Sequence, residues 1–218
     1  NCYGMFDNCK SLTEIPNLPY NQITNAVYMF ENCMNITTID KEMNLSNCNC
    51  INYMFHNSGL ENVDMSKIKF KSTLNSVTSL FKNCTNLTTV TNMNFSGTNV
   101  NNYINLFNGC TTLSDNIQIQ ESNNMYNCYA MFMNCTNFKN IPNINYNNIQ
   151  YCADYIFYGC KNITTINNLN LSKANECKDL IQNCENLTTV SNLNLYNAIN
   201  ADWLFVNCKN LSNVDNII

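Results

Sequence analysis

Hydrophobic and polar positions follow one short motif that returns nine times along the chain. Each copy has an aliphatic or Met residue, a Phe, one variable position, Asn or Gly, usually a Cys, and another aliphatic residue three positions later. The Phe position, replaced by Ile in the eighth copy, falls at Phe6, Phe30, Phe55, Phe81, Phe107, Phe132, Phe157, Ile181 and Phe205. Because the period stays at 24–26 residues, the pattern predicts a solenoid whose coils bury their apolar faces only by stacking on one another.

The first half of each copy has the periodicity of a helix. The apolar residue before the Phe, the Phe itself and the Cys fall at i, i+1 and i+4, which predicts the inner face of a short helix. The variable position after the Phe is expected to face solvent. The next position holds only Asn or Gly, which tolerate left-handed backbone, so we expect it to end each helical turn. These nine residues are Asn8, Asn32, Asn57, Asn83, Gly109, Asn134, Gly159, Asn183 and Asn207.

The second half of each copy has the rhythm of a strand. In the eighth copy Leu187 is followed by Val190, Leu193 and Leu195, a spacing that predicts a short strand, and stacked copies would form a parallel sheet. Asn residues recur in register between these apolar positions, which predicts ladders of side-chain amides between coils. The Asn residues are Asn92 and Asn94, Asn143 and Asn145, Asn168 and Asn170, and Asn192 and Asn194.

The predicted fold class is therefore an α/β solenoid. We expect a right-handed array of about nine coils, each with one short helix and one short parallel strand. Residues 1–218 form a single domain in this prediction. Because the chain starts at Asn1 rather than Met, we expect it to be a segment of a longer protein.

Two copies depart from the pattern. The third lacks one residue and has Ser58 in the place of the Cys. The fifth has Asn116 where Ile or Val is expected and continues as Ile117-Gln118-Ile119-Gln120-Glu121. Insertions in solenoids usually loop out on one face and sometimes mark the binding face, so this segment is a candidate for ligand binding.

The fourteen cysteines raise the question of disulfides or a metal site. Eight share the motif position and are predicted to point inward as reduced thiols, because parallel Cβ atoms about 5 Å apart miss the ~3.8 Å of a disulfide. They are Cys9, Cys33, Cys84, Cys110, Cys135, Cys160, Cys184 and Cys208. The other six are Cys2, Cys48, Cys50, Cys128, Cys152 and Cys177. Whole-coil spacing keeps four ligands from converging on one zinc ion, so no metal site is expected.

The repeats resemble a known family. Residues 80–90, Leu-Phe-Lys-Asn-Cys-Thr-Asn-Leu-Thr-Thr-Val, are similar to the BspA-like leucine-rich repeats of bacterial, phage and protist surface proteins. The resemblance covers essentially the whole chain, although Asn often replaces a Leu that the family usually has after the second aliphatic residue. It implies a leucine-rich-repeat-like array that acts in adhesion or in recognition of host surface components, and it brings no catalytic residues.

Composition excludes several classes of function. The chain has 49 Asn, 11 Lys, no Arg and 15 acidic residues, so it lacks the basic stripe that nucleic-acid binding needs. No apolar run approaches the ~20 residues of a membrane span. An enzyme is not expected either, because the single histidine, His56, is predicted to be exposed, and Asp40, Asp64 and Asp215 are interpreted as turn residues. The five Gly form no phosphate-binding loop, and no cofactor is expected.

Three functions remain open. The first is a recognition module on a cell surface or virion that binds a protein or glycan through the sheet face or the fifth-copy segment. The second is a structural spacer or decoration of such an assembly, and the third is ice binding by rows of Thr, which we disfavour because other residues interrupt them. Exposed aromatic residues would favour a glycan: the candidates are Tyr28, Tyr53, Tyr129, Tyr155 and Trp203.

The two terminal copies lack a polar cap. We expect apolar residues to be exposed at both ends, and therefore end-to-end contacts, a flanking segment or another subunit to cover them. The residues concerned are Met5, Phe6 and Leu12 at one end and Leu211, Val214 and Ile217 at the other.

Overall fold

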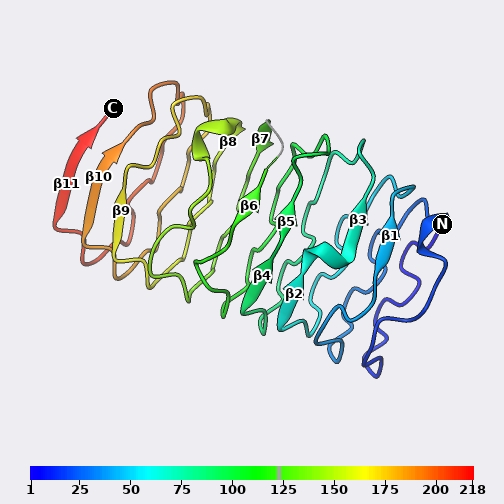
Figure 1. The fold of residues 1–218 in the computed structure, drawn as a ribbon. Helices are drawn as coiled ribbons and strands as arrows, with labels where there is room; N and C mark the ends of the chain where they lie inside the picture. Colours follow the sequence, from blue (N-terminus) through cyan, green and yellow to red (C-terminus); the bar gives the residue numbers. More distant parts are fainter. Residues whose placement is uncertain (122–123) are drawn as a thin grey trace.

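The computed structural model describes residues 1–121 and 124–218 as a parallel β-solenoid. Successive coils lie side by side from the N-terminus to the C-terminus, and the arrows of the strands run in one direction (Figure 1). The strands are β1 (Met43–Leu45), β2 (Asn62–Asp64), β3 (Ile68–Phe70), β4 (Thr89–Thr91), β5 (Met93–Asn94), β6 (Ile119–Gln120), β7 (Met125–Asn127), β8 (Ile149–Cys152), β9 (Thr165–Asn167), β10 (Thr189–Leu193) and β11 (Asn213–Ile217). Short 3₁₀ helices are η1 (Tyr20–Gln22), η2 (Met65–Lys67) and η3 (Tyr146–Asn148).

The strands form three rows, because each coil places up to three short extended segments against its neighbours. One row contains the pair β2–β4 and the sheet β9–β10–β11, and a second contains β1–β3 and β5–β6. The third row contains β7–β8 and is extended by single bridges on either side, such as Ser76 to Asn102 and Glu176 to Asn200. All these pairs are parallel, which confirms the predicted parallel solenoid.

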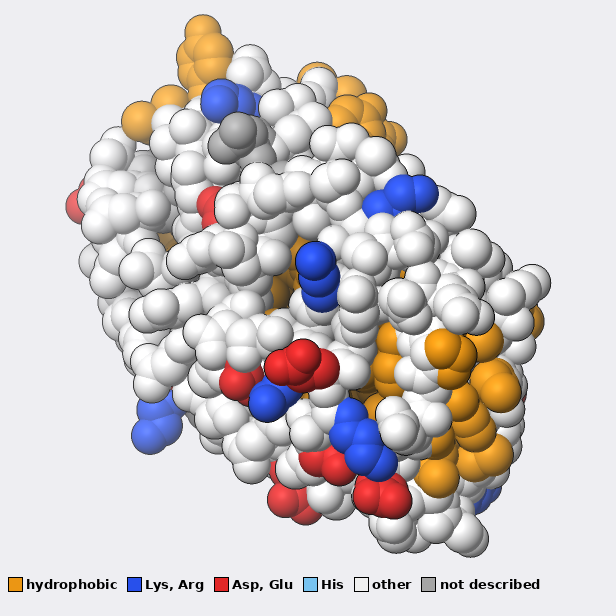
Figure 2. Space-filling view, turned by 45° about the vertical axis from the view of Figure 1, so that its right-hand side comes forward, with side chains coloured by type: hydrophobic (Ala, Val, Ile, Leu, Met, Phe, Trp, Pro, Cys, Tyr) orange, Lys and Arg blue, Asp and Glu red, His pale blue; other side chains and the backbone are white. Residues whose placement is uncertain are grey.

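About seven turns make up the solenoid, rather than the nine complete coils expected from the nine motif copies. The first and last copies have a neighbour on one side only and bury few of their residues; in the last copy Cys208 is the buried one. Apolar side chains gather on the end of the array nearest the N-terminus (Figure 2). Met5 is 52% exposed there, and Ile217 is 44% exposed at the other end.

A wall of consecutive turns replaces the helix that was expected in each coil. In the second coil the N–H groups of Tyr28, Phe30 and Asn32 donate to carbonyl oxygens of the next coil at 2.9–3.2 Å. The N–H groups between them donate to carbonyl oxygens three residues back, for example Glu31 to Tyr28 at 3.2 Å. The helix prediction was therefore wrong: beyond its first turn an α-helix bonds each N–H four residues back, whereas here bonds three residues back alternate with bonds to the next coil.

Two left-handed positions in every coil explain this wall. All nine Asn and Gly residues that were predicted to be left-handed have positive φ, from 55° at Asn57 to 78° at Gly109. A second left-handed position lies two residues before the Phe, and the residue types there do not reveal it because most of them ordinarily avoid positive φ. Its members are Gly4, Tyr28, Tyr53, Ser79, Asn105, Ala130, Tyr155, Asp179 and Trp203, which we call the left-handed column. An α-helix cannot run through two such residues four positions apart.

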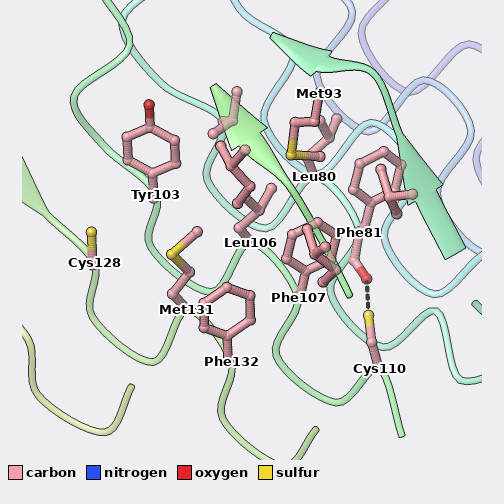
Figure 3. Packing of buried hydrophobic residues seen from close by; sticks show 14 of the residues in the cluster. Leu80, Phe81, Met93, Tyr103, Leu106, Phe107, Cys110, Cys128, Met131 and Phe132 are labelled. Atoms are coloured by element: carbon pink, nitrogen blue, oxygen red, sulfur yellow. Dashed lines mark hydrogen bonds between the residues drawn. The ribbon is translucent and has the colours of Figure 1, made fainter. Parts of the chain in front are cut away.

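The Phe residues of the motif form one internal column, as predicted. Seven rings from Phe6 to Phe157 stack nearly parallel, with centroids 5.4–6.1 Å apart and planes within 10° of each other. From Phe30 to Phe157 these rings are completely buried, and Leu80, Leu106 and other apolar residues pack beside them (Figure 3). The core therefore runs the length of the array.

The motif cysteines lie inward beside this column, except Cys9, which is exposed. Each buried thiol of the set donates a hydrogen bond to the carbonyl oxygen of the Phe or Ile one coil earlier, at 3.0–3.2 Å. All fourteen cysteines are unpaired in the structure.

Candidate binding surface

A trough crosses the second strand row where the fifth-copy segment joins it. Its volume is about 390 Å³, and its lining contains no charged residue. Apolar residues of η2, β3 and β5 form one part of the lining, and side-chain amides from the fourth and fifth coils form the other. The lining residues are Met65, Ser66, Ile68, Phe70, Asn92, Met93, Asn94, Gln118 and Gln120.

The hollow exists because the third coil takes a longer path than its neighbours. Between the buried residues Val63 and Ile68 the chain inserts η2, whereas the fourth coil passes directly from Val90 to Met93. The side chain of Asp64 accepts a hydrogen bond from the N–H of Ser66 at 3.0 Å and so begins η2. Hydrogen bonds from Asn92 and Ser66 lower the pKa of this carboxyl.

The fifth-copy segment does not loop out. Ile117 and Ile119 are buried, and β6 pairs with β5 so that Gln120 lies opposite Asn94. Gln118 and Gln120 therefore point outward from the wall of the trough, and among the described residues their side-chain amides make no hydrogen bond. That this segment contributes to a binding face stays a prediction.

A second, shallower hollow lies on the same row near the C-terminus. Asn168, Asn192 and Asn216 form the predicted amide ladder, with bonds of 2.9 Å and 2.6 Å between side chains of successive coils. Asn170 and Asn194 lie beside them and also line the hollow. Asn143 and Asn145, predicted to join the ladder, form no such side-chain bond among the described residues.

Aromatic side chains gather on other walls. Tyr126 and Tyr151 are stacked with centroids 5.3 Å apart and are 48% and 42% exposed, and the repeated motif does not predict this pair because both residues lie outside it. Of the predicted aromatic candidates, Tyr129 and Trp203 are exposed. Tyr28, Tyr53 and Tyr155 are partly buried, and Tyr28 lies 4.8 Å from Tyr53 between ring centroids.

The Thr rows are occupied by bonds within the array. The hydroxyls of Thr88 and Thr89 both donate to the side-chain oxygen of Asn62, at 2.9 and 2.6 Å, and Thr188 donates to the carbonyl oxygen of Thr164 at 3.0 Å. Hydroxyls held in this way are not free to order water, which weighs further against ice binding.

His56 is not the freely exposed residue that the sequence indicated. Its side chain is 19% exposed, and its Nδ1 lies 2.6 Å from a carboxylate oxygen of Glu31 in the preceding coil. Nε2 lies 3.4 Å from the amide nitrogen of Asn83 in the following coil. His56 thus links three coils on the turn wall and is far from the trough residues in the repeat.

Within the described residues, no group of three or more His, Cys, Asp or Glu side chains could hold a metal ion. Nor does the described part contain a helix of the length and apolarity required to cross a membrane.

Comparison with known proteins places the repeats in a family. The chain is similar to a leucine-rich repeat protein from Bacteroides ovatus ATCC 8483, with 18% identity and a TM-score of 0.43 over 99% of this chain. The match spans 63% of that protein's solved chain. A search of curated proteins gives no match. A family model described as "Mycoplasma protein of unknown function, DUF285" matches residues 1–118 and again residues 75–193. With most of its length matched, the chain belongs to this DUF285 repeat family.

Proposed function

We propose that the protein is a non-enzymatic recognition module on an external surface, of a cell or a virion, and that it binds a neutral glycan in the trough. The observation that carries this proposal is the pair of unbonded amides, Gln118 and Gln120, on the wall of an uncharged hollow. A side-chain amide has both donors and an acceptor, which matches the hydroxyl groups of a sugar. Ligand sites generally combine an apolar floor with a few polar groups of this kind.

The charge distribution favours a neutral ligand over an acidic one. Glu42, Lys67 and Lys69 line the adjacent hollow toward the N-terminus rather than the trough itself. The carboxylate beside the trough, that of Asp64, accepts hydrogen bonds from Asn92 and Ser66 of the lining and would repel an acidic ligand. A charged ligand in the trough would lose its hydration without gaining an opposite charge. Phe70, which is partly buried in the trough, offers an apolar surface against which a sugar ring can pack.

A glycan array with the 218-residue chain tests this proposal. We expect binding to neutral oligosaccharides, and we expect the double variant Q118A/Q120A to bind about tenfold more weakly, because each lost hydrogen bond is worth about 0.5–1.5 kcal/mol. Gln182→Ala, on the turn wall, is the matched control and should bind like the unchanged protein. Equal binding by the double variant, or selection of acidic glycans only, would contradict the proposal.

A structural role is the second candidate, and strand pairing is the contact that would serve it. Strand β11 is exposed along its whole length and pairs with β10 on one side only. An open strand edge of this kind can pair with another chain. In this alternative the array is a spacer whose ends contact other members of a surface assembly.

A further inference from the structure

One buried carboxylate on the turn wall has an aromatic residue at the equivalent position of each neighbouring coil. Asp179 belongs to the left-handed column, with Tyr155 one coil before it and Trp203 one coil after it. Backbone bonds fix this register: the N–H of Tyr155 donates to the carbonyl oxygen of Lys178, and that of Asp179 to the carbonyl oxygen of Asp202, at 3.0 and 2.9 Å. The short Asp179 side chain therefore lies between two much larger ones.

Asp179 is 1% exposed, and neither of its carboxylate oxygens has a hydrogen-bond partner. The Tyr155 hydroxyl approaches the carboxylate, and this interaction, together with burial, raises the pKa of Tyr155 to about 12, but its geometry falls short of a full hydrogen bond. Asp179 forms no ion pair with any described Lys or His. A buried carboxylate without donors is costly to the fold, so the position calls for a compensating group.

The other unbonded buried side chain of the column shows why Asp179 is different. Ser79 is also fully buried with an unbonded oxygen. Burying its neutral hydroxyl without a partner costs little free energy, whereas an ionised carboxylate can only accept hydrogen bonds and needs donors from other groups. Asp179 is thus the position in the column where a ligand bearing N–H groups would gain most.

The side chain that follows Asp179 in the left-handed column is exposed and weakly held. Trp203 is 64% exposed, and the Nζ of Lys178 lies 5.0 Å from its ring centroid. A cation–π contact at an exposed site stabilises only weakly, so Trp203 can move aside at small cost. Tyr129, whose ring centroid is 5.3 Å from that of Tyr155, extends the aromatic rim on the other side.

We propose that Asp179, Tyr155 and Trp203 form a binding site for a primary ammonium group, and specifically for the side chain of an exposed lysine on a partner protein. The three N–H groups of the ammonium supply donors for the two unbonded carboxylate oxygens, and its charge neutralises the carboxylate. The methylene stem packs between the two aromatic rings, where cation–π attraction adds to binding. The site lies on the turn wall, away from the trough, so this proposal does not depend on the glycan.

Other ligands fit this position less well. A metal ion would find one carboxylate, and no described cluster offers the further ligands it needs. A quaternary ammonium has no N–H to donate, and a neutral hydroxyl leaves the charge uncompensated. These differences give the experiment its control ligands.

The fluorescence of Trp203 reports directly on the site, because it is the single tryptophan of the chain. The probe is lysine with its α-amino and α-carboxyl groups blocked, titrated into the 218-residue protein, with the Nε-acetylated form of the same compound and tetramethylammonium as controls. We expect a saturable change in emission with the primary ammonium only. Asp179→Asn keeps the shape of the side chain and should weaken binding at least about tenfold, whereas Asp202→Asn, on an exposed residue of the next coil, should change it less than about twofold.

Two further measurements separate a binding site from a buried structural group. Lys178→Met removes the competing ammonium from the face of Trp203 and should strengthen binding of the probe about two- to fivefold. The probe should also raise the melting temperature of the unchanged protein but not that of Asp179→Asn. The proposal is overturned if the acetylated probe binds as well as the primary ammonium, or if folded Asp179→Asn binds the probe as the unchanged protein does. It is also overturned if the primary ammonium changes neither the emission of Trp203 nor the melting temperature of the unchanged protein.

Discussion

The thiol of Cys110 donates a hydrogen bond to the carbonyl oxygen of Phe81, one coil earlier, at 3.0 Å (Figure 3). The same carbonyl oxygen accepts the N–H of Cys84 within its own turn at 3.1 Å. A thiol is a weak donor and can use the second lone pair of an oxygen that is already bonded. A small apolar side chain with one weak hydrogen-bond donor is therefore what this position requires, and a reduced Cys supplies both.

Alkaline pH should destabilise the protein through these thiols. Burial raises the pKa of Cys84 to about 11 and that of Cys160 to about 12, against an ordinary value of 9.0. The folded state holds these thiol protons more tightly than the unfolded chain does. The part of the free energy of unfolding that comes from the protonated thiols is therefore complete below about pH 9 and is lost as the pH rises through about 11 to 12. Urea unfolding at a series of pH values should show the decline.

Cys84→Ala isolates one thiol in that experiment. The variant should be less stable at neutral pH, because it loses the bond to Phe55 and leaves a small cavity, but its stability should fall less steeply above about pH 9. Parallel pH curves for the two proteins would show that the buried thiol is not the titrating group.

Replacing one ring of the Phe column should be costly. Phe132 is fully buried and stacks on Phe107 and Phe157 at 5.9 and 6.1 Å, so Phe132→Ala should lower the free energy of unfolding by about 3–5 kcal/mol. Lys82→Ala, on the rim of the turn wall, should change it by less than about 0.5 kcal/mol. Calorimetry of both variants measures the difference, and similar melting temperatures would contradict the assignment of inner and outer positions.

Gly159 should be intolerant of a side chain. Its φ is +69°, and an added Cβ would collide with the side-chain oxygen of Asn134 in the preceding coil. Gly159→Ala should therefore cost about 1–3 kcal/mol. Gly97→Ala is the control, since nothing lies within 4 Å of a Cβ at that position. Because Asn134 is itself left-handed, the comparison is made against Asn134→Ala: Gly159→Ala should cost less in that background than in the unchanged protein in chemical denaturation, and equal costs would leave backbone strain as the whole cause.

The 218-residue chain should self-associate through its open coils. Val214 is 44% exposed on β11, whose outer edge is unpaired, and Val214→Lys should suppress association because charge on an edge strand opposes pairing. Thr85→Lys adds the same charge to an exposed position in the middle of the array and should have little effect. Sedimentation velocity over a range of concentrations distinguishes the three proteins, and a monomer at every concentration would remove support from the structural alternative.

Periodicity was sufficient to predict the stacking of coils, because Phe30, Phe81 and Phe157 keep the same place in every period. It also predicted the left-handed Asn position, since only Asn and Gly occur there. The helix was predicted wrongly because Phe and Cys at i and i+3 face inward equally well in a series of turns. Tyr28 and Trp203, at the second left-handed position, belong to residue types that ordinarily avoid it, so tertiary bonds between coils overrode local preference.

The binding surface was only partly visible in the sequence. The irregular fifth copy drew attention to Gln118 and Gln120, which do line the trough. The hollow itself depends on η2 in the third coil, where extra residues after Val63 displace the chain, and nothing in the composition of Met65-Ser66-Lys67 indicates a cavity. The sequence does not single out Asp179 either, because Tyr155 and Trp203, its neighbours in the left-handed column, lie 24 residues away on either side in other coils.

The hydrogen bonds between coils join residues 22–29 positions apart, which means that each coil is held by its immediate neighbours. A genetic deletion or duplication of one whole repeat would therefore leave each remaining junction with the same partners it had before. The number of coils can change over generations while the fold persists, whereas gain or loss of a few residues has to be absorbed within one coil, as η2 does in the third. Length is thus the most freely heritable property of this molecule.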